Sequence, residues 1–212
     1  MVKKISDNDK NILGLIFCNN LNKLTTVQKI IKQTNIDKKH LLEKLENLKG
    51  KKYIIQKNNS YFITKKGRLQ ISVVLTGGVY DIIHPGHIYT LKKSKKMGDV
   101  LIVSIATDKR VKKIKNKKPL NNEKKRASLV SAIRYVDHAL VGSKKNIFNI
   151  VKKIKPDIIT IGYDQKHNMI GLKKLAVKNK MKIRVVKLDS PIPKVKSSLI
   201  INRNIQKETE II

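Results

Sequence analysis

A glycine-rich segment ending in two histidines holds the side chains of this sequence best suited to chemistry. It covers residues 76–87 and reads T-G-G-V-Y-D-I-I-H-P-G-H. Gly77 and Gly78 let the backbone turn tightly and approach a ligand, and a helix that follows offers free N–H groups to an anion. His84 and His87 flank a proline of fixed φ, so both imidazoles can be directed at one point as hydrogen-bond donors. This combination predicts a phosphate-binding loop.

Two other interpretations of His84 and His87 remain open. In the first, one imidazole caps the helix and the other packs in the core. In the second, the pair ligates a metal ion, as histidines three residues apart can do. No third ligand lies nearby in the sequence, so no protein metal site is expected.

Short apolar runs alternate with amphipathic helices from residue 71 to the end of the chain. The runs cover residues 73–76, 100–106, 138–141, 157–161 and 183–188. Apolar strands separated by helices are typical of a parallel sheet covered on both faces. Residues 71–212 are therefore expected to form a doubly wound, Rossmann-like α/β domain. Such a sheet binds ligands at the carboxyl ends of its strands where the strand order reverses, which points to the loops after residues 76, 106 and 161.

Residues 1–70 follow a different pattern, of short helices and then a hairpin. Ser6 and Asp37 can cap the first and third helices, and residues 25–34 form the second. Two β-rich triplets, 53–55 and 61–63, flank a polar turn. Helix, helix, helix and hairpin is the order of a winged helix, which can place its third helix in a major groove. DNA is thus one candidate partner of residues 1–70, and a small module for dimerisation or substrate cover is the alternative.

Composition limits the class of protein. The 212 residues carry a formal charge of +33, with 48 basic residues against 15 acidic ones. Residues 1–70 and 71–212 have a similar net positive charge per residue, so the sequence has no basic tail. The excess of lysine over arginine is also what an AT-rich coding bias would produce. A single cysteine, Cys18, excludes a disulfide framework, and the longest apolar runs are far too short for a membrane span. A cytoplasmic protein is expected.

The motif G-G-V-Y-D-I-I-H-P-G-H resembles the G-T-F-D-x-x-H-x-G-H signature of the cytidylyltransferase-like nucleotidyltransferases. The resemblance extends over residues 73–201 and does not cover the first 70. Residues 162–165, G-Y-D-Q, look most like the corresponding loop of the archaeal FAD synthases within that family. Arg126 and Arg134 stand where arginines of the family contact phosphates. Because they are eight residues apart, they are expected to share one helix face directed at a polyphosphate.

The resemblance implies roles for individual residues. Catalysis is assigned to His84, His87 and Arg134. Nucleotide binding is assigned to Gly78, Val79, Tyr80, Asp81, His84, Pro85, Gly86, His87, Lys118, Arg126, Asp164, Ser197 and Ser198.

The implied reaction is transfer of a nucleoside monophosphate with release of pyrophosphate. The G-Y-D-Q loop favours ATP and FMN as substrates and FAD as product. Transfer from CTP to glycerol 3-phosphate or a similar phosphorylated alcohol is the alternative, and a DNA-binding regulator with a nucleotide-sensing domain is a second one. Mg²⁺ or another divalent cation is expected on the triphosphate, with Asp81 nearby. A homodimer is compatible with this assignment, and no membrane contact is expected.

Overall fold

The chain folds into two compact units, Met1–Ser72 and Val73–Ile212. The computed structural model describes residues 5–22, 24–143, 147–162, 169–179 and 181–189. Each unit is described by itself below. No helix among these residues is both long and apolar enough to cross a membrane.

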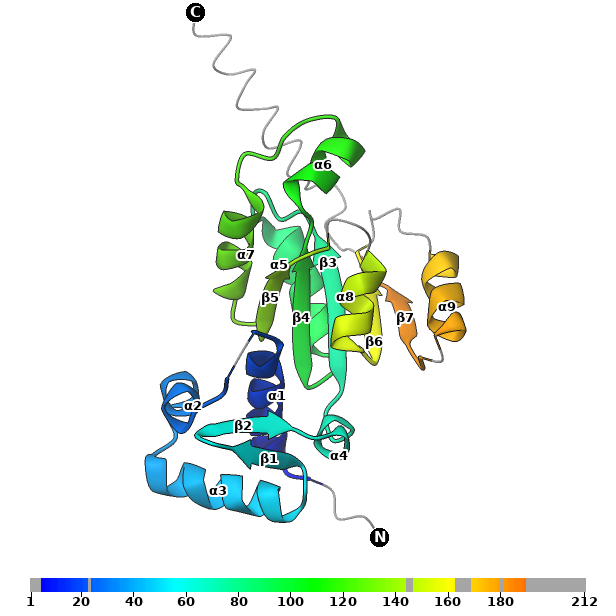
Figure 1. Ribbon diagram of the computed structural model, residues 1–212. Coiled ribbons are helices and arrows are strands. Elements are labelled where there is room, and N and C mark those ends of the chain that lie inside the picture. Colours follow the sequence, from blue (N-terminus) through cyan, green and yellow to red (C-terminus); the bar gives the residue numbers. More distant parts are fainter. Residues whose placement is uncertain (1–4, 23, 144–146, 163–168, 180, 190–212) are drawn as a thin grey trace, which may run out of the picture. The chain divides into compact units, whose positions relative to one another are not determined.

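The first unit has the expected order of three helices and a hairpin (Figure 1). Its elements are α1 (Asp7–Asn22), α2 (Val27–Thr34), α3 (Lys38–Gly50), β1 (Ile54–Lys57), β2 (Ser60–Ile63) and the short α4 (Lys65–Arg68). Asp37 caps α3, as expected, by accepting a hydrogen bond from the His40 N–H at 2.9 Å. The side chain of Asn20 fastens the hairpin to α1, because its amide donates to the Tyr61 carbonyl and its oxygen accepts from the Ile63 N–H. The winged-helix assignment itself stays a prediction.

The second unit is built on a five-stranded parallel sheet with the order β5-β4-β3-β6-β7. Its strands are β3 (Val73–Gly78), β4 (Val100–Ile105), β5 (His138–Val141), β6 (Ile158–Ile161) and β7 (Arg184–Lys187). The chain moves outward from β3 to β4 and β5, and then returns to the other side of β3 with β6. This is the expected doubly wound topology, and its reversal point lies between β3 and β6 at their carboxyl ends.

Helices cover both faces of the sheet (Figure 1). On one face, Leu91 of α5 (Pro85–Lys95) and Val130 of α7 (Glu123–Ser131) pack with Val74 and Val103 in a fully buried apolar cluster. On the other face lies α8 (Ile147–Ile154), whose Val151 and Ile154 are also buried. Because both faces are covered, the strands are apolar throughout, which is why the sequence predicts them so clearly.

Two further helices complete the unit, α6 (Asp108–Lys115) after β4 and α9 (Met169–Lys178) before β7. Thr107 caps α6 through the Arg110 N–H, and Asn122 caps α7 through the N–H groups of Lys124 and Lys125. Figure 1 shows α6 beyond the carboxyl end of β4, the end of the sheet at which a ligand is expected.

Candidate nucleotide site

The glycine-rich loop lies between β3 and α5, at the reversal point of the sheet. Within it, Tyr80 adopts a left-handed backbone conformation, with φ of 54°, and its side chain is buried. A Cβ atom placed on Gly78 would lie 2.7 Å from the Tyr80 ring, closer than real Cβ contacts. Gly78 is therefore required by the close approach of this ring to the backbone.

Three aromatic rings lie close together in this loop: His84 and His87 are stacked, and Tyr80 is tilted against His87. The ring centroids of His84 and His87 lie 3.9 Å apart at an interplanar angle of 29°, and that of Tyr80 lies 4.8 Å from His87. The two imidazoles therefore lie side by side at the start of α5, as the sequence predicts. The buried Tyr80 ring packs against His87.

The first turn of α5 is open to an anion. Helices α2, α3, α4, α6 and α7 each begin with a side-chain oxygen that accepts a hydrogen bond from their first turn. Helix α5 begins with His84 as N-cap and Pro85 in its first turn, and it has no side-chain cap hydrogen bond. Pro85 has no N–H and the His87 N–H donates to the His84 carbonyl, so the start of α5 offers a phosphate the Gly86 N–H and the positive end of the helix dipole.

The environment of His87 keeps its imidazole neutral. Burial, followed by the neighbouring His84 and, more weakly, Lys115, lowers the pKa of His87 from 6.5 to about 4, while a backbone hydrogen bond at Ile82 acts in the opposite direction. Its Nδ1 atom is buried and makes no hydrogen bond within the described part of the chain. A neutral imidazole can still donate one hydrogen bond, and a bound polyphosphate would raise its pKa by stabilising the charged form.

Asp81 has a different role from the expected one beside a metal ion. Its two carboxylate oxygens accept hydrogen bonds from the backbone N–H groups of Leu120 and Asn121, both at 2.9 Å, and the side chain is largely buried. The Asn121 side-chain amide also donates to the Asp81 carbonyl. Asp81 therefore joins the glycine-rich loop to the loop before α7.

Arg126 is the largest fully buried side chain, with 0% exposure. Its guanidinium donates to the carbonyls of Asn121 at 2.8 Å, Val79 at 2.5 Å and Ala106 at 2.7 Å, and forms a 2.6 Å ion pair with Asp108. These four bonds use four of the five donors of an arginine. In this structure the donors of Arg126 hold three loops of the protein together, and its contact with a phosphate stays a prediction.

Arg134 lies at the other end of the sheet from these loops. Helix α7 ends at Ser131, so Arg134 falls in the turn that follows, where it is exposed beside the ring of Tyr135. Asp137, three residues after Arg134, donates its backbone N–H to the Leu101 carbonyl near the start of β4. Arg126, by contrast, donates to the Ala106 carbonyl, just after the end of β4. The two arginines do not share a face toward one ligand, and within a single chain Arg134 is separated from His84 and His87 by the length of β4.

The remaining assigned residues divide into two groups. Lys118 is exposed on the loop that ends at the contacts with Asp81, where it is free to meet a phosphate. Asp164, Ser197 and Ser198 lie outside the described residues. Among the described residues, no cluster of three or more histidine, cysteine or acidic side chains could hold a metal ion.

The loop after β4, which begins at Ala106, also contributes to this site. Asp108 pairs with Arg126, and its backbone N–H donates to the Glu123 carboxylate at 2.7 Å. The sequence offers one sign of this loop, a threonine and an aspartate directly after a buried strand, which is the pattern of a helix N-cap.

A parallel sheet with an uncapped helix start and paired imidazoles at its reversal point defines a nucleotide-binding protein built for phosphate chemistry. Residues 75–203 match the family described as Cytidylyltransferase-like, and the chain belongs to this family. The chain is 44% identical to the FAD synthase of Picrophilus torridus over 132 residues, which cover 62% of this chain and 94% of that protein. It is 48% identical to the FAD synthase of Methanosphaera stadtmanae over 118 residues, 54% of this chain and 79% of the relative.

A solved structure shares both fold and sequence with the second unit. It is the crystal structure of a lipopolysaccharide core biosynthesis protein from Thermoplasma volcanium, which is 38% identical with a TM-score of 0.55. The match covers 57% of this chain and 98% of the other. The family match begins only at residue 75, so it does not include the first unit.

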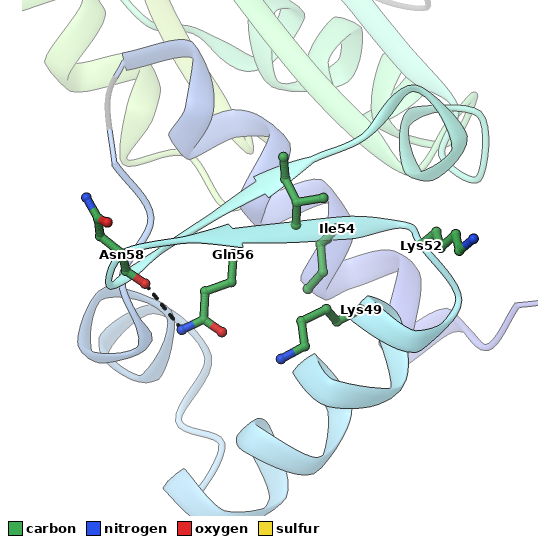
Figure 2. Close-up of a pocket in the computed structure, with 6 residues that line it drawn as sticks. Lys49, Lys52, Ile54, Gln56 and Asn58 are labelled. Atoms are coloured by element: carbon green, nitrogen blue, oxygen red, sulfur yellow. Dashed lines mark hydrogen bonds between the residues drawn. The ribbon is translucent and has the colours of Figure 1, made fainter.

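The first unit has a hollow of its own, between the end of α3 and the hairpin (Figure 2). It measures about 610 Å³ and is lined by Lys49, Lys52, Ile54, Ile55, Gln56 and Asn58. The Lys49 ammonium pairs with Glu46 at 2.6 Å, whereas Lys52 is exposed and has no acidic partner among the described residues. The hollow therefore combines a basic rim of Lys49 and Lys52 with apolar and amide side chains.

Proposed function

We propose that this protein transfers AMP from ATP to FMN, giving FAD and pyrophosphate. The observation that supports it most directly is the stacked pair of His84 and His87 at the uncapped start of α5. This pair occurs in a chain 39 to 48% identical to eight FAD synthases. Adenylyl transfer to FMN is therefore favoured over cytidylyl transfer to a phosphorylated alcohol.

The reaction needs no nucleophile from the protein. A phosphate oxygen of FMN attacks the α-phosphorus of ATP in line, the new P–O bond forms, and the bond to the β-phosphate breaks as pyrophosphate leaves. Catalysis then consists of positioning the two substrates and stabilising the charge on the phosphate oxygens. His84, His87 and the Gly86 N–H at the start of α5 supply hydrogen-bond donors for that charge, and Lys118 adds a positive charge at the loop edge.

Both carboxylate oxygens of Asp81 already accept hydrogen bonds from backbone N–H groups, and no other acidic, histidine or cysteine side chains of the described residues form a metal-binding cluster with it. A divalent cation is instead expected to enter as part of the Mg·ATP substrate, held by the phosphates themselves. Lys118 and the two imidazoles carry the protein's own share of charge stabilisation.

A substrate grid tests the proposal. Purified protein is incubated with ATP or CTP against FMN or glycerol 3-phosphate, and products and pyrophosphate are measured by chromatography and a coupled assay. FAD should form from ATP and FMN, with one pyrophosphate for each FAD. Greater turnover of CTP with glycerol 3-phosphate would contradict the proposal and favour the alternative.

We also propose that residues 1–70 contact DNA. The basic rim beside α3 and the exposed lysines Lys38 and Lys39 at the start of that helix support it, while Glu43 and Glu46 on the same helix are unfavourable for a phosphate contact. A gel shift with duplex DNA over a salt titration tests this. A steep salt slope that is reduced by Lys38→Gln and Lys39→Gln is expected. Absence of a gel shift at about 100 mM salt would contradict DNA binding by residues 1–70 and favour a structural role for this unit.

Two further expectations belong to the same proposal, a cytoplasmic location and a homodimer. The single cysteine, Cys18, is buried and has no second cysteine in the chain to form a disulfide with, which is compatible with a reducing compartment. Light scattering measures the oligomeric state directly, and a mass near 24.2 kDa would exclude the dimer.

A further inference from the structure

The strongest concentration of charge in the described chain lies on α6 and the loop after it. Residues 109–118, called the cationic segment below, contain seven lysines and arginines and no acidic residue. At the average of the whole chain, ten residues would carry about two basic side chains. All seven are exposed, and none has a carboxylate partner in the part of the chain that the structure describes: Lys109, Arg110, Lys112, Lys113, Lys115, Lys117 and Lys118.

The acidic groups around the cationic segment are turned inward. Asp108 pairs with the buried Arg126, and Glu123 accepts from the Asp108 backbone N–H. The two carboxylate oxygens of Asp81 accept hydrogen bonds from the backbone N–H groups of Leu120 and Asn121. These three carboxylates stabilise the loops, and so they neutralise little of the outward positive charge.

Both ends of the cationic segment are fixed beside the candidate nucleotide site. At its start, Val111 of α6 is buried, and Asp108 is tied to Arg126. At its end, the loop is tied to Asp81 of the glycine-rich loop. The field of the segment reaches the histidines, since Lys115 is among the causes that lower the pKa of His87.

Background lysine content does not account for this arrangement. In α3, by comparison, Lys49 pairs with Glu46 and Lys44 pairs with Asp9, so a lysine-rich helix of this protein is partly neutralised. The cationic segment lacks such pairs in the part of the chain that the structure describes, and it lies at the end of the sheet that holds His84, His87 and the candidate nucleotide site. Unpaired charge beside a site raises the local concentration of oppositely charged ligands and their association rate.

We propose that the cationic segment provides electrostatic steering, which accelerates the association of anionic nucleotides with the site. It acts at long range, through residues such as Lys112 and Lys113 that need not touch the bound substrate. The inference rests on the proposed function for the identity of its ligands, ATP and FMN, which are both negatively charged through their phosphates.

The test compares two matched pairs of lysines. Lys112→Gln with Lys113→Gln removes two charges from the last turn of α6, and Lys152→Gln with Lys153→Gln removes two from the last turn of α8, an equally short helix on a face of the sheet. Association of N-methylanthraniloyl-ATP is followed by stopped-flow fluorescence over a range of ionic strength. Circular dichroism confirms that both variants are folded.

The α6 variant should bind the probe about five- to tenfold more slowly at 10 mM ionic strength, where the Debye length is about 30 Å. The difference should fall below about 1.5-fold at 1 M, where that length is about 3 Å. The α8 variant should change less than twofold throughout, and N-methylanthraniloyl-AMP, with less charge, should show a smaller effect.

Equal slowing in both variants would overturn the inference, because only net charge would then matter. An α6 variant that associates as fast as the parent protein would overturn it too. The inference would also be overturned if the α6 variant lost binding to a duplex oligonucleotide while its association with the nucleotide probe stayed normal. If the α6 variant binds the probe more slowly as expected but ATP and FMN give no FAD, the steering inference is supported and the proposed reaction is contradicted.

Discussion

Replacing Arg126 by methionine tests whether this arginine holds the loops of the site together or binds a phosphate. Methionine keeps most of the volume of the side chain and removes every donor. The Val79, Ala106 and Asn121 carbonyls then lose their partner, and Asp108 loses its counter-ion.

The expected loss of stability follows from the burial of this side chain. Arg126 is fully buried, and removing one partner of a buried ion pair costs about 3–5 kcal/mol because the other charge is left uncompensated. Part of that cost is relieved here, since the Asp108 side chain is 38% exposed and can turn to water. We therefore expect a loss of about 3 kcal/mol, which lowers the Tm of the second unit by about 10 °C.

The assay is thermal and urea unfolding followed by circular dichroism, together with the KM for ATP and kcat. Arg126→Lys should recover part of the stability, because an ammonium can still pair with Asp108 but cannot reach all three carbonyls. Arg134→Met is the matched control, since Arg134 is exposed just beyond the same helix, and it should change stability by less than about 0.5 kcal/mol.

A different outcome would refute this reasoning. If Arg126→Met keeps full stability and raises only the KM for ATP, the arginine turns outward to the nucleotide, and the loops do not depend on it. Loss of stability together with at least a tenfold loss in kcat/KM would support the positioning role.

Three other predictions concern the glycine-rich loop. His84→Ala should lower kcat by about a hundredfold or more with little change in Tm, since a side-chain donor to the reacting phosphates is lost; full activity would exclude its role. Gly78→Ala should lower both stability and activity, because the added methyl displaces the Tyr80 ring, and Gly78→Ala with Tyr80→Leu should recover part of the stability. The free energy of unfolding should fall as the pH drops from 6.5 to about 4, since the unfolded chain binds the His87 proton more readily than the folded one. His87→Asn should remove up to about 3 kcal/mol of that pH dependence, and an unchanged pH profile would show that His87 is not buried as a neutral group.

The sheet and the glycine-rich loop could be predicted because their determinants are local in sequence. Strands buried on both faces are apolar throughout, and a glycine pair before H-P-G-H identifies the loop at the end of the first of them. The stacking of His84 and His87 follows from three residues of sequence separation at a helix start.

The roles of the two arginines could not be predicted, because they depend on contacts between distant segments. Arg126 meets carbonyls 47 and 20 residues away, and nothing in the sequence around it indicates burial. The spacing of eight residues assumed a helix continuing through Arg134, but α7 ends at Ser131. Asp81 was expected beside a metal for its charge, whereas backbone N–H groups of residues 39 and 40 positions away occupy its oxygens.

The central claim, adenylyl transfer to FMN at the paired histidines, is tested most directly by following the label of [α-³²P]ATP. With FMN present, the label should appear in FAD, with one pyrophosphate released for each FAD, and His84→Ala should abolish this transfer while the protein stays folded. Label that stays in ATP or appears only in AMP, or a His84→Ala protein that makes FAD at the normal rate, would contradict the claim.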